Sequence, residues 1–281
     1  MNLLIAGCGD LGTELGLLAA AAGHRVHGLR RSPELLPEPI VGLPGDLTRP
    51  LAGLPSDTDL LVYAAAPGER TPAAYRETYV DGPERVLSAL DVAGARVERV
   101  LFVASTAVYG VADGSWVDET TPTEPTSTTG PLLVEAERRL WGRRPDAISL
   151  RLAGVYGPGR TRLVDQVREG RAVIPEPPVH TNRMHRDDAA RAILHLLTSV
   201  DEPATCYLGV DDDPADRGEV LRFLADELGV PHPPTGPDQR SRGGDKRCRN
   251  ARLRGTGFTL EYPTYREGYR AILAGRGVRH P

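Results

Sequence analysis

Short apolar runs alternate with longer segments of helical periodicity through the first half of the chain. The apolar runs predict strands at residues 3–6, 25–29, 60–66, 100–104 and 148–152, and the longer segments predict helices at 11–22, 73–93 and 132–141. Gly82-Pro83 is expected to interrupt the second of these helices. Such alternation is typical of a parallel sheet with helices on both faces, so we predict an α/β fold with a doubly wound parallel sheet.

The pattern changes after residue 157. Gly157-Pro158-Gly159 breaks the alternation, three prolines crowd residues 175–178, and further helices are predicted at 187–197 and 218–228. The stretch 231–245 is rich in proline, glycine and charge, which predicts a surface loop. We therefore divide the chain into a first domain at 1–157 and a mixed segment at 158–281 that completes the sheet and forms a small C-terminal substrate lobe.

A glycine-rich turn follows the first predicted strand and opens the first predicted helix. Its sequence, Gly7-Cys8-Gly9-Asp10-Leu11-Gly12, fits the pattern G-x-G-x-x-G. Gly7 permits a tight turn, Gly9 lets backbone N–H groups approach a pyrophosphate, and Gly12 lets the helix pack closely on the strand. The helix N-terminus then faces the anion. This context predicts that residues 1–157 form a Rossmann-type, NAD(P)-binding domain. The alternative is a plain glycine turn between strand and helix. Cys8 is counted with the cofactor-binding residues of this turn, and its side chain is expected to be a small filler, with a reactive role as the alternative.

The second predicted strand ends in a basic segment, Leu29-Arg30-Arg31-Ser32. An NAD enzyme usually has Asp or Glu there to hold the ribose 2′-hydroxyl. Two guanidinium groups suit a 2′-phosphate instead, so Arg30 and Arg31 favour NADP(H), with NAD as the open alternative. A solvated basic turn would carry the same residues. Asp46 and Leu47, which follow a third strand, are expected to hold the adenine.

The composition excludes several classes of partner. A net charge of -4 and a pI of about 6.0 argue against a nucleic acid or a membrane surface. The three cysteines have no metal-ligand spacing, and no apolar stretch approaches the roughly 20 residues of a membrane span. We therefore expect a cytoplasmic protein without a metal or disulfides. Of the 34 basic residues only Lys246 is a lysine, which excludes chemistry that needs a lysine elsewhere.

Several further segments carry recognisable patterns in a fixed order. They are Val62-Tyr63-Ala64-Ala65-Ala66, residues 103–110 ending in Val-Tyr-Gly, R-x-x-x-x-Y-G-P-G at 151–159, an H-V-x-D-like stretch at 184–190 and a closing segment at 262–268. With these the chain resembles the extended short-chain dehydrogenase/reductases, the sugar-nucleotide epimerase/dehydratase group, over nearly its whole length. Arg186 stands where valine is usual in that group. The resemblance implies a nicotinamide cofactor that lies beside Ala64, Ala65 and Ala66.

The same resemblance implies which residues would do the chemistry. In that family Ser or Thr, Tyr and Lys act together, and Tyr and Lys stand four apart on one helix face. The lysine's charge lowers the tyrosine pKa toward neutrality, which makes the phenol a usable acid and base. Ser105 occupies the serine position, but Thr129 fills the tyrosine slot and Leu133 the lysine slot. Because no tyrosine lies between Tyr109 and Tyr156, the chain resembles an atypical branch that lacks the Tyr-x-x-x-Lys pair.

Three candidates for chemistry remain near the expected nicotinamide position. Ser105 and Thr106 are expected to face the ring, and Tyr109 is the phenol that survives in this region. Tyr109 either replaces the missing acid and base, or it lines the substrate pocket or packs. Tyr79 stands where the family usually has asparagine, a second departure of the same kind.

The substrate side is expected to be basic. Tyr156 and Arg183 are predicted to contact the substrate, with Arg151, Arg160 and Arg162 gathered around a phosphorylated or nucleotide-linked ligand. The alternative is a solvated basic rim. His185 is expected to be structural, and Asp187 or Asp188 is expected to cap the helix that follows it.

Two functional hypotheses follow. The first is an NADP(H)-dependent, epimerase/dehydratase-like enzyme that acts on a sugar nucleotide or a related carbonyl or hydroxyl compound by a non-standard mechanism. The second is a catalytically inactive NADP(H)-binding sensor or scaffold. A polar pocket over the nicotinamide would favour the enzyme, and a pocket filled by Tyr109 or residues 126–129 would favour the sensor. The partner is expected to be a small molecule, and the chain a monomer or a homodimer through the helices at 75–90 and 132–141.

Overall fold

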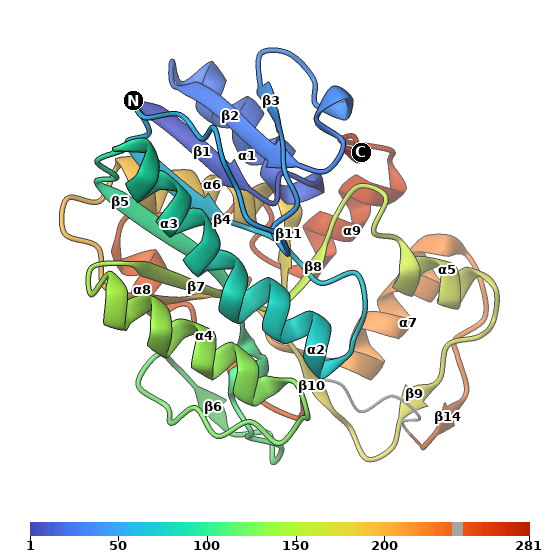
Figure 1. The fold of residues 1–281 in the computed structure, drawn as a ribbon. Coiled ribbons are helices and arrows are strands. Elements are labelled where there is room, and N and C mark those ends of the chain that lie inside the picture. Colours follow the sequence, from blue (N-terminus) through green and yellow to red (C-terminus); the bar gives the residue numbers. More distant parts are fainter. Residues whose placement is uncertain (238–243) are drawn as a thin grey trace.

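A seven-stranded parallel sheet forms the centre of the molecule, in the order β12-β7-β5-β4-β1-β2-β3 (Figure 1). The computed structural model describes residues 1–237 and 244–281. The sheet strands are β1 (Asn2–Ala6), β2 (Arg25–Arg30), β3 (Val41–Pro44), β4 (Leu60–Tyr63), β5 (Arg99–Ser105), β7 (Ile148–Leu152) and β12 (Cys206–Gly209). The predicted Rossmann-type fold is therefore confirmed, with its strand order turning at β1.

Helices cover both faces of this sheet (Figure 1). One face carries α1 (Asp10–Ala21) and α6 (Arg186–Thr198), and the other carries α3 (Gly82–Ala93) and α4 (Gly130–Arg143). Because β4 is buried along its whole length, it needs apolar residues on both faces, and Leu-Leu-Val-Tyr supplies them. Among the described residues, each helix is too short or too polar to cross a membrane.

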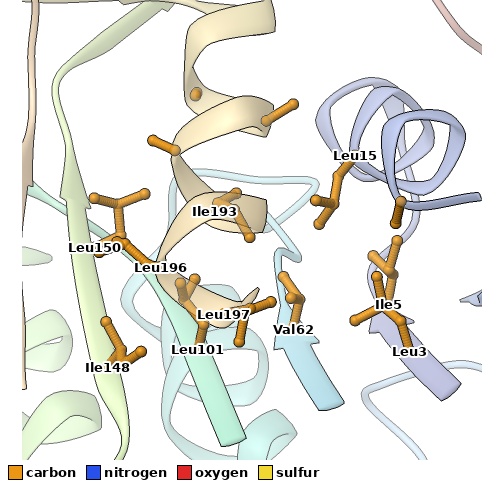
Figure 2. Close-up of a cluster of buried hydrophobic side chains, with 14 of the residues drawn as sticks. Leu3, Ile5, Leu15, Val62, Leu101, Ile148, Leu150, Ile193, Leu196 and Leu197 are labelled. Carbon is orange, nitrogen blue, oxygen red and sulfur yellow. The ribbon is translucent and has the colours of Figure 1, made fainter. Parts of the chain in front are cut away.

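The core under α1 and α6 fixes the position of the first helix. Figure 2 shows Leu15 of α1 and Ile193 of α6 pointing toward the apolar side chains of the sheet, including Ile5 and Val62. All four are fully buried. Burial of such side chains stabilises the fold by about 1.5–3 kcal/mol each, so the start of α1 is held rigidly against the end of β1.

The helix predicted at 73–93 changes type at Gly82-Pro83 and does not end there. The chain runs helically through α2 (Pro72–Tyr75), a π-helical segment η2 (Arg76–Asp81) and α3. Pro83 has no N–H to donate to the preceding π-helical turn, and the Thr78 carbonyl of that turn accepts a hydrogen bond from the Tyr63 hydroxyl instead. A side chain at Gly82 would overlap the hydroxyl of Tyr63, so this glycine lets the helix approach β4.

A second, smaller core lies in the C-terminal lobe. It joins α5 (Arg162–Arg168), α7 (Arg217–Leu228) and α9 (Tyr265–Leu273) around residues such as Val164, Leu221 and Tyr269. The remaining helix is α8 (Ala251–Gly255), and η1 (Pro33–Leu35) and η3 (Thr106–Val108) are single 3₁₀ turns. β12 of the later segment pairs with β7 of the first, so both segments contribute to one sheet. The division of the chain at residue 157 therefore stays a prediction.

Short strands bring loops of the lobe together. The pairs are β8 (Gly154–Tyr156) with β11 (Arg183–His185), β9 (Ile174–Pro175) with β14 (Thr235–Gly236), β10 (His180–Thr181) with β13 (Ala215–Asp216), and β6 (Trp116–Val117) with β15 (Arg247–Cys248). The predicted loop at 231–245 thus contains β14, while its residues 238–243 lie outside the described part of the chain. Of these strands, β8 follows β7 and contributes Val155 to the lining of the cleft described below, and β11 pairs with it.

Candidate functional site

A cleft of about 590 Å³ opens at the carboxyl ends of the sheet strands. Parallel sheets of this type bind ligands at that edge, beside the strand where the order reverses. The predicted residues that line it are Gly7, Gly9, Asp10, Leu11, Gly12, Arg30, Arg31, Asp46, Leu47, Ala64, Ala65, Ala66 and Ser105. One surface therefore joins the glycine turn, the basic end of β2 and the serine at the end of β5.

The glycine turn has the geometry that a close-lying ligand requires. Gly7 is left-handed (φ +86°), and a Cβ on it would come within 2.5 Å of the Ala65 backbone. Gly9 is extended (φ -91°), and a Cβ on it would meet nothing within 4 Å, so the space above it is open. The first helical bond of α1 runs from Thr13 N–H to the Gly9 carbonyl at 2.7 Å. The N–H groups of the residues between them have no acceptor within the helix, so they are available to an anion.

Cys8 is the one residue of the G-x-G-x-x-G segment that does not line the cleft. Its side chain is fully buried in the core under α1, and burial raises the pKa of the thiol to about 11. Its amide donates to the Leu29 carbonyl at 3.2 Å. Cys8 therefore supports the turn from behind, as a small filler, and its expected place in the cofactor surface is not met.

The basic end of the cleft is partly occupied by the chain's own groups. Arg30 Nη1 donates to the main-chain oxygen of Pro281 at 2.8 Å. Asp46 Oδ1 accepts from the Thr48 N–H at 2.9 Å and from its hydroxyl at 2.8 Å, and these bonds lower the pKa of the carboxyl. Asp46 thus shapes its own turn with one oxygen, while its other oxygen lies 3.8 Å from Arg49 Nε.

The opposite end of the cleft carries hydroxyl groups. Ser105 caps the turn η3, and its Oγ accepts from the Ala107 N–H at 3.2 Å, which leaves the hydroxyl proton for another acceptor. Thr78 and Tyr79 of the π-helical segment also line the cleft. Burial raises the pKa of Tyr79 to about 12. The resemblance marked Tyr79 only as a replaced asparagine, yet it is the tyrosine that the described structure brings to the cleft.

Tyr109 does not line the cleft. Its hydroxyl accepts a hydrogen bond from Arg151 Nη1 at 2.6 Å, and Arg151 binds Glu137 with two further nitrogens at 2.8 and 2.7 Å. All three side chains are at least 95% buried. Burial raises the pKa of Tyr109 far above its usual range, despite the neighbouring guanidinium. Tyr109 is therefore held in a structural network, and Thr106, which begins η3, is likewise absent from the cleft lining.

The expected cluster of arginines on the substrate side is not formed. Arg151 is buried in the network with Glu137, and Arg183 is buried over the ring of Tyr265 at 5.3 Å. Arg162 lies on an adjoining surface pocket, so of these four arginines only Arg160 lines the cleft. Tyr156 is also buried, against Tyr269 with ring centroids 4.7 Å apart, and does not reach the cleft lining.

The two residues that the resemblance aligns with the Tyr-x-x-x-Lys pair make structural contacts. Thr129 is the residue before the first turn of α4, and Leu133 is buried in a cluster with Val108 and Leu208. Lys246 donates through Nζ to the Tyr109 carbonyl at 3.3 Å and is absent from the cleft lining. Burial lowers the pKa of Lys246.

The cap of α6 differs from the expected aspartate. His185 Nδ1 accepts from the Asp187 N–H at 3.3 Å, and burial lowers the pKa of His185 to about 4, so the ring is a neutral acceptor at pH 7. Asp188 instead accepts from the backbone N–H groups of Glu261 and Tyr262, both at 2.8 Å. The predicted cap is wrong because this carboxylate is needed to hold a segment more than 70 residues away.

The chain is similar to known proteins over most of its length. The model of the NAD dependent epimerase/dehydratase family matches residues 3–208. Protein YeeZ of Escherichia coli K12 is 30% identical over 211 residues, which span 70% of this chain and 73% of YeeZ. A solved structure from Methylobacillus flagellatus with the same family description is 36% identical, with a TM-score of 0.80 over 98% of both chains. MoeE5, solved with UDP-glucuronic acid and NAD, is 23% identical, with a TM-score of 0.79 over 97% of both chains, and shares the fold.

Replacing Tyr109 with phenylalanine should lower stability without weakening a ligand in the cleft. The change removes an acceptor of Arg151 in a buried site, which costs about 1–3 kcal/mol. Urea unfolding should therefore shift to a lower midpoint. Tyr75→Phe is the matched control, because among the described residues the Tyr75 hydroxyl has no hydrogen-bond partner. An unchanged midpoint in Tyr109→Phe would contradict the structural role.

Proposed function

The chain belongs to the NAD dependent epimerase/dehydratase family, and from this premise we propose that it is an enzyme that binds NADP(H) in the cleft. We propose further that it acts on a sugar nucleotide or a related carbonyl or hydroxyl compound. The observation that carries this proposal is the single open cleft that joins the glycine turn to Ser105. A dinucleotide with its pyrophosphate on the turn would place its nicotinamide beside that serine.

The glycine turn fits such a cofactor. The open space above Gly9 and the N–H groups at the start of α1 suit a pyrophosphate, and the bound NAD of MoeE5 supports a nicotinamide dinucleotide on this fold. Arg30 and Arg31 at the end of β2 supply the charge for a 2′-phosphate. The Pro281 oxygen takes one N–H group of Arg30, and a guanidinium has five, so a phosphate can share this residue. NAD remains the alternative.

Turnover is favoured over a pure sensor because the cleft is not filled. Neither Tyr109 nor residues 126–129 line it, whereas the hydroxyl-bearing residues Ser105, Thr78 and Tyr79 do. When bound, the nicotinamide supplies or takes up a hydride. Ser105 would donate its hydroxyl proton as a hydrogen bond to the reacting oxygen, since its Oγ already accepts from Ala107. With a pKa near 12, Tyr79 orients the substrate and does not exchange protons at neutral pH.

The mechanism we propose depends on positioning. General acid–base catalysis contributes about 10²–10⁴-fold in enzymes, and the Thr129 and Leu133 slots lack the groups that supply it. We therefore expect slow turnover by an orientation-based route. The second candidate, an inactive NADP(H)-binding sensor, is favoured by the same two residues. The three buried, unpaired cysteines are compatible with a cytoplasmic protein, and a monomer or homodimer remains the expectation.

Gly9→Ala tests the cofactor cradle. The new methyl group meets no protein atom, so the fold should be unaffected, but it enters the space where the pyrophosphate must approach. Fluorescence titration should show NADPH and NADH both bound about tenfold more weakly or worse, which corresponds to about 1.4 kcal/mol. Gly142→Ala in α4 is the control, because a Cβ there also meets nothing. Unchanged affinity in Gly9→Ala would place the dinucleotide elsewhere.

Arg30→Ala and Arg31→Ala test the NADP(H) preference. Each change should weaken NADPH by roughly tenfold while NADH affinity stays constant, because a charge-assisted bond to the 2′-phosphate is lost. Arg25→Ala, at the other end of β2, is the matched control. Equal affinity of the parent for both cofactors, unaltered by the changes, would refute the preference.

Ser105→Ala tests turnover. The parent should convert at least one sugar nucleotide from a panel with NADP(H), and the variant should lose about 10²-fold in kcat, as when one hydrogen-bond donor to a reacting oxygen is removed. Cofactor affinity should be retained. Tight cofactor binding with no turnover of any panel member would favour the sensor.

A further inference from the structure

The first residue of α1 is an acid, in the place where the proposed cofactor puts its pyrophosphate. Asp10 lies in the cleft lining, and its side chain is only 8% exposed. Burial by itself would raise the pKa of this carboxyl, but hydrogen bonds from Arg160 and the His280 amide lower it, so Asp10 is ionised. An uncompensated carboxylate there would repel a diphosphate, so its partners decide what the site binds.

Two arginines compensate Asp10, and they differ in freedom. Arg186 Nη1 lies 2.9 Å from Oδ1, and its side chain is 1% exposed. The other nitrogens of Arg186 are engaged by Asp187 at 2.5 Å and by the Val278 carbonyl at 2.9 Å, with Glu14 3.3 Å from Nη2. Arg186 is therefore fixed, and its charge is balanced by the acids around it.

Arg160 is the partner that remains available. It donates from Nε to Asp10 Oδ2 at 2.8 Å, and its side chain is 37% exposed and lines the cleft. Among the described residues, neither Nη group of Arg160 donates a hydrogen bond to the protein. Those two nitrogens form a planar edge that matches the spacing of phosphate oxygens.

The turn that carries Arg160 is held against α1. The Arg160 N–H bonds the Gly157 carbonyl at 3.0 Å, and Arg279 Nη1 bonds the Gly159 carbonyl at 2.7 Å. The following residue, His280, donates its N–H to Asp10 Oδ1 at 3.1 Å. Figure 1 shows the C-terminal end of the chain returning to the N-terminal part of the sheet. The guanidinium is thus pre-positioned, which reduces the entropy lost on binding.

We infer that Arg160 is a cofactor-binding residue contributed by the later half of the chain, which contacts the pyrophosphate from the side opposite the glycine turn while Asp10 holds its Nε. This inference rests on the proposed function. It adds a ligand that the G-x-G-x-x-G pattern does not contain, and it predicts equal effects on NADH and NADPH.

The competing explanation is a purely structural Arg160–Asp10 ion pair, and the two substitutions of that pair distinguish them. If Arg160 binds the pyrophosphate, Arg160→Ala should weaken ADP-ribose about tenfold or more, because a charge-assisted contact is lost. Asp10→Asn should leave the affinity equal or tighter, because the amide oxygen can still accept from Arg160 Nε while a negative charge leaves the site. If the ion pair only holds the site together, breaking it from either side should weaken binding to a similar extent.

Calorimetric titration of ADP-ribose should be run on the parent, both variants, Arg160→Lys and the control Arg162→Ala, an exposed arginine two residues away. Lysine should recover part of the affinity, and Arg162→Ala should match the parent. Melting temperatures without ligand show whether Arg160→Ala is folded. If a folded Arg160→Ala binds ADP-ribose like the parent, or if Asp10→Asn weakens binding equally, this inference alone is overturned. A parent that binds none of the nucleotides would overturn the proposed function as well.

Discussion

The close approach of the glycine turn to the end of β4 sets the geometry of the whole cleft. Only a residue without a side chain can stand at Gly7, because the Ala65 backbone occupies the space and the backbone is left-handed. The turn can then bond the Leu29 carbonyl at the end of β2. These contacts bring the ends of β1, β2 and β4 and the start of α1 to one surface. The cradle is therefore made mainly of backbone, and the side chains around it can vary without destroying it.

Buried arginine is the second constraint on this site. A guanidinium keeps its charge when buried, so each buried arginine requires acids around it, and the pair is favourable only when its hydrogen bonds are satisfied. Arg151 meets this need with Glu137 and the Tyr109 hydroxyl, which removes that phenol from the cleft. Arg186 meets it with Asp10 and Asp187, which neutralises an acid inside the cleft. Buried arginine thus holds the Tyr109 hydroxyl away from the cleft and balances the charge of Asp10 within it.

The sequence could predict the parts of the site that depend on local pattern. Gly7 and Gly9 follow from a strand, a turn and a helix in immediate succession, and Arg30 and Arg31 follow from the end of β2. It could not predict where Tyr109 points, because the 3₁₀ turn after Ser105 redirects the chain and pattern does not reveal such a turn.

The sequence also could not predict contacts between segments that lie far apart along the chain. Asp188 was expected to cap its own helix, but its oxygens bind N–H groups at residues 261 and 262. Arg183 was expected in the substrate pocket, but the ring of Tyr265 covers it. In each case a partner more than 70 residues away decides the role, and no local propensity encodes that choice.

Leu133, at the position that the resemblance assigns to lysine, packs in a cluster that is separate from the glycine turn. A lysine at this position would bring a charge into a cluster that holds Val108, Val117, Leu208 and Val210. Leucine instead joins α4 to the edge strand β12 and the chain after β5 through apolar contact. Since desolvating an unpaired ammonium costs several kcal/mol, a lysine at this position would need a partner, as the buried Lys246 has in the Tyr109 carbonyl. The glycine turn has no part in this cluster, so the packing around Leu133 leaves the geometry of the turn unaffected.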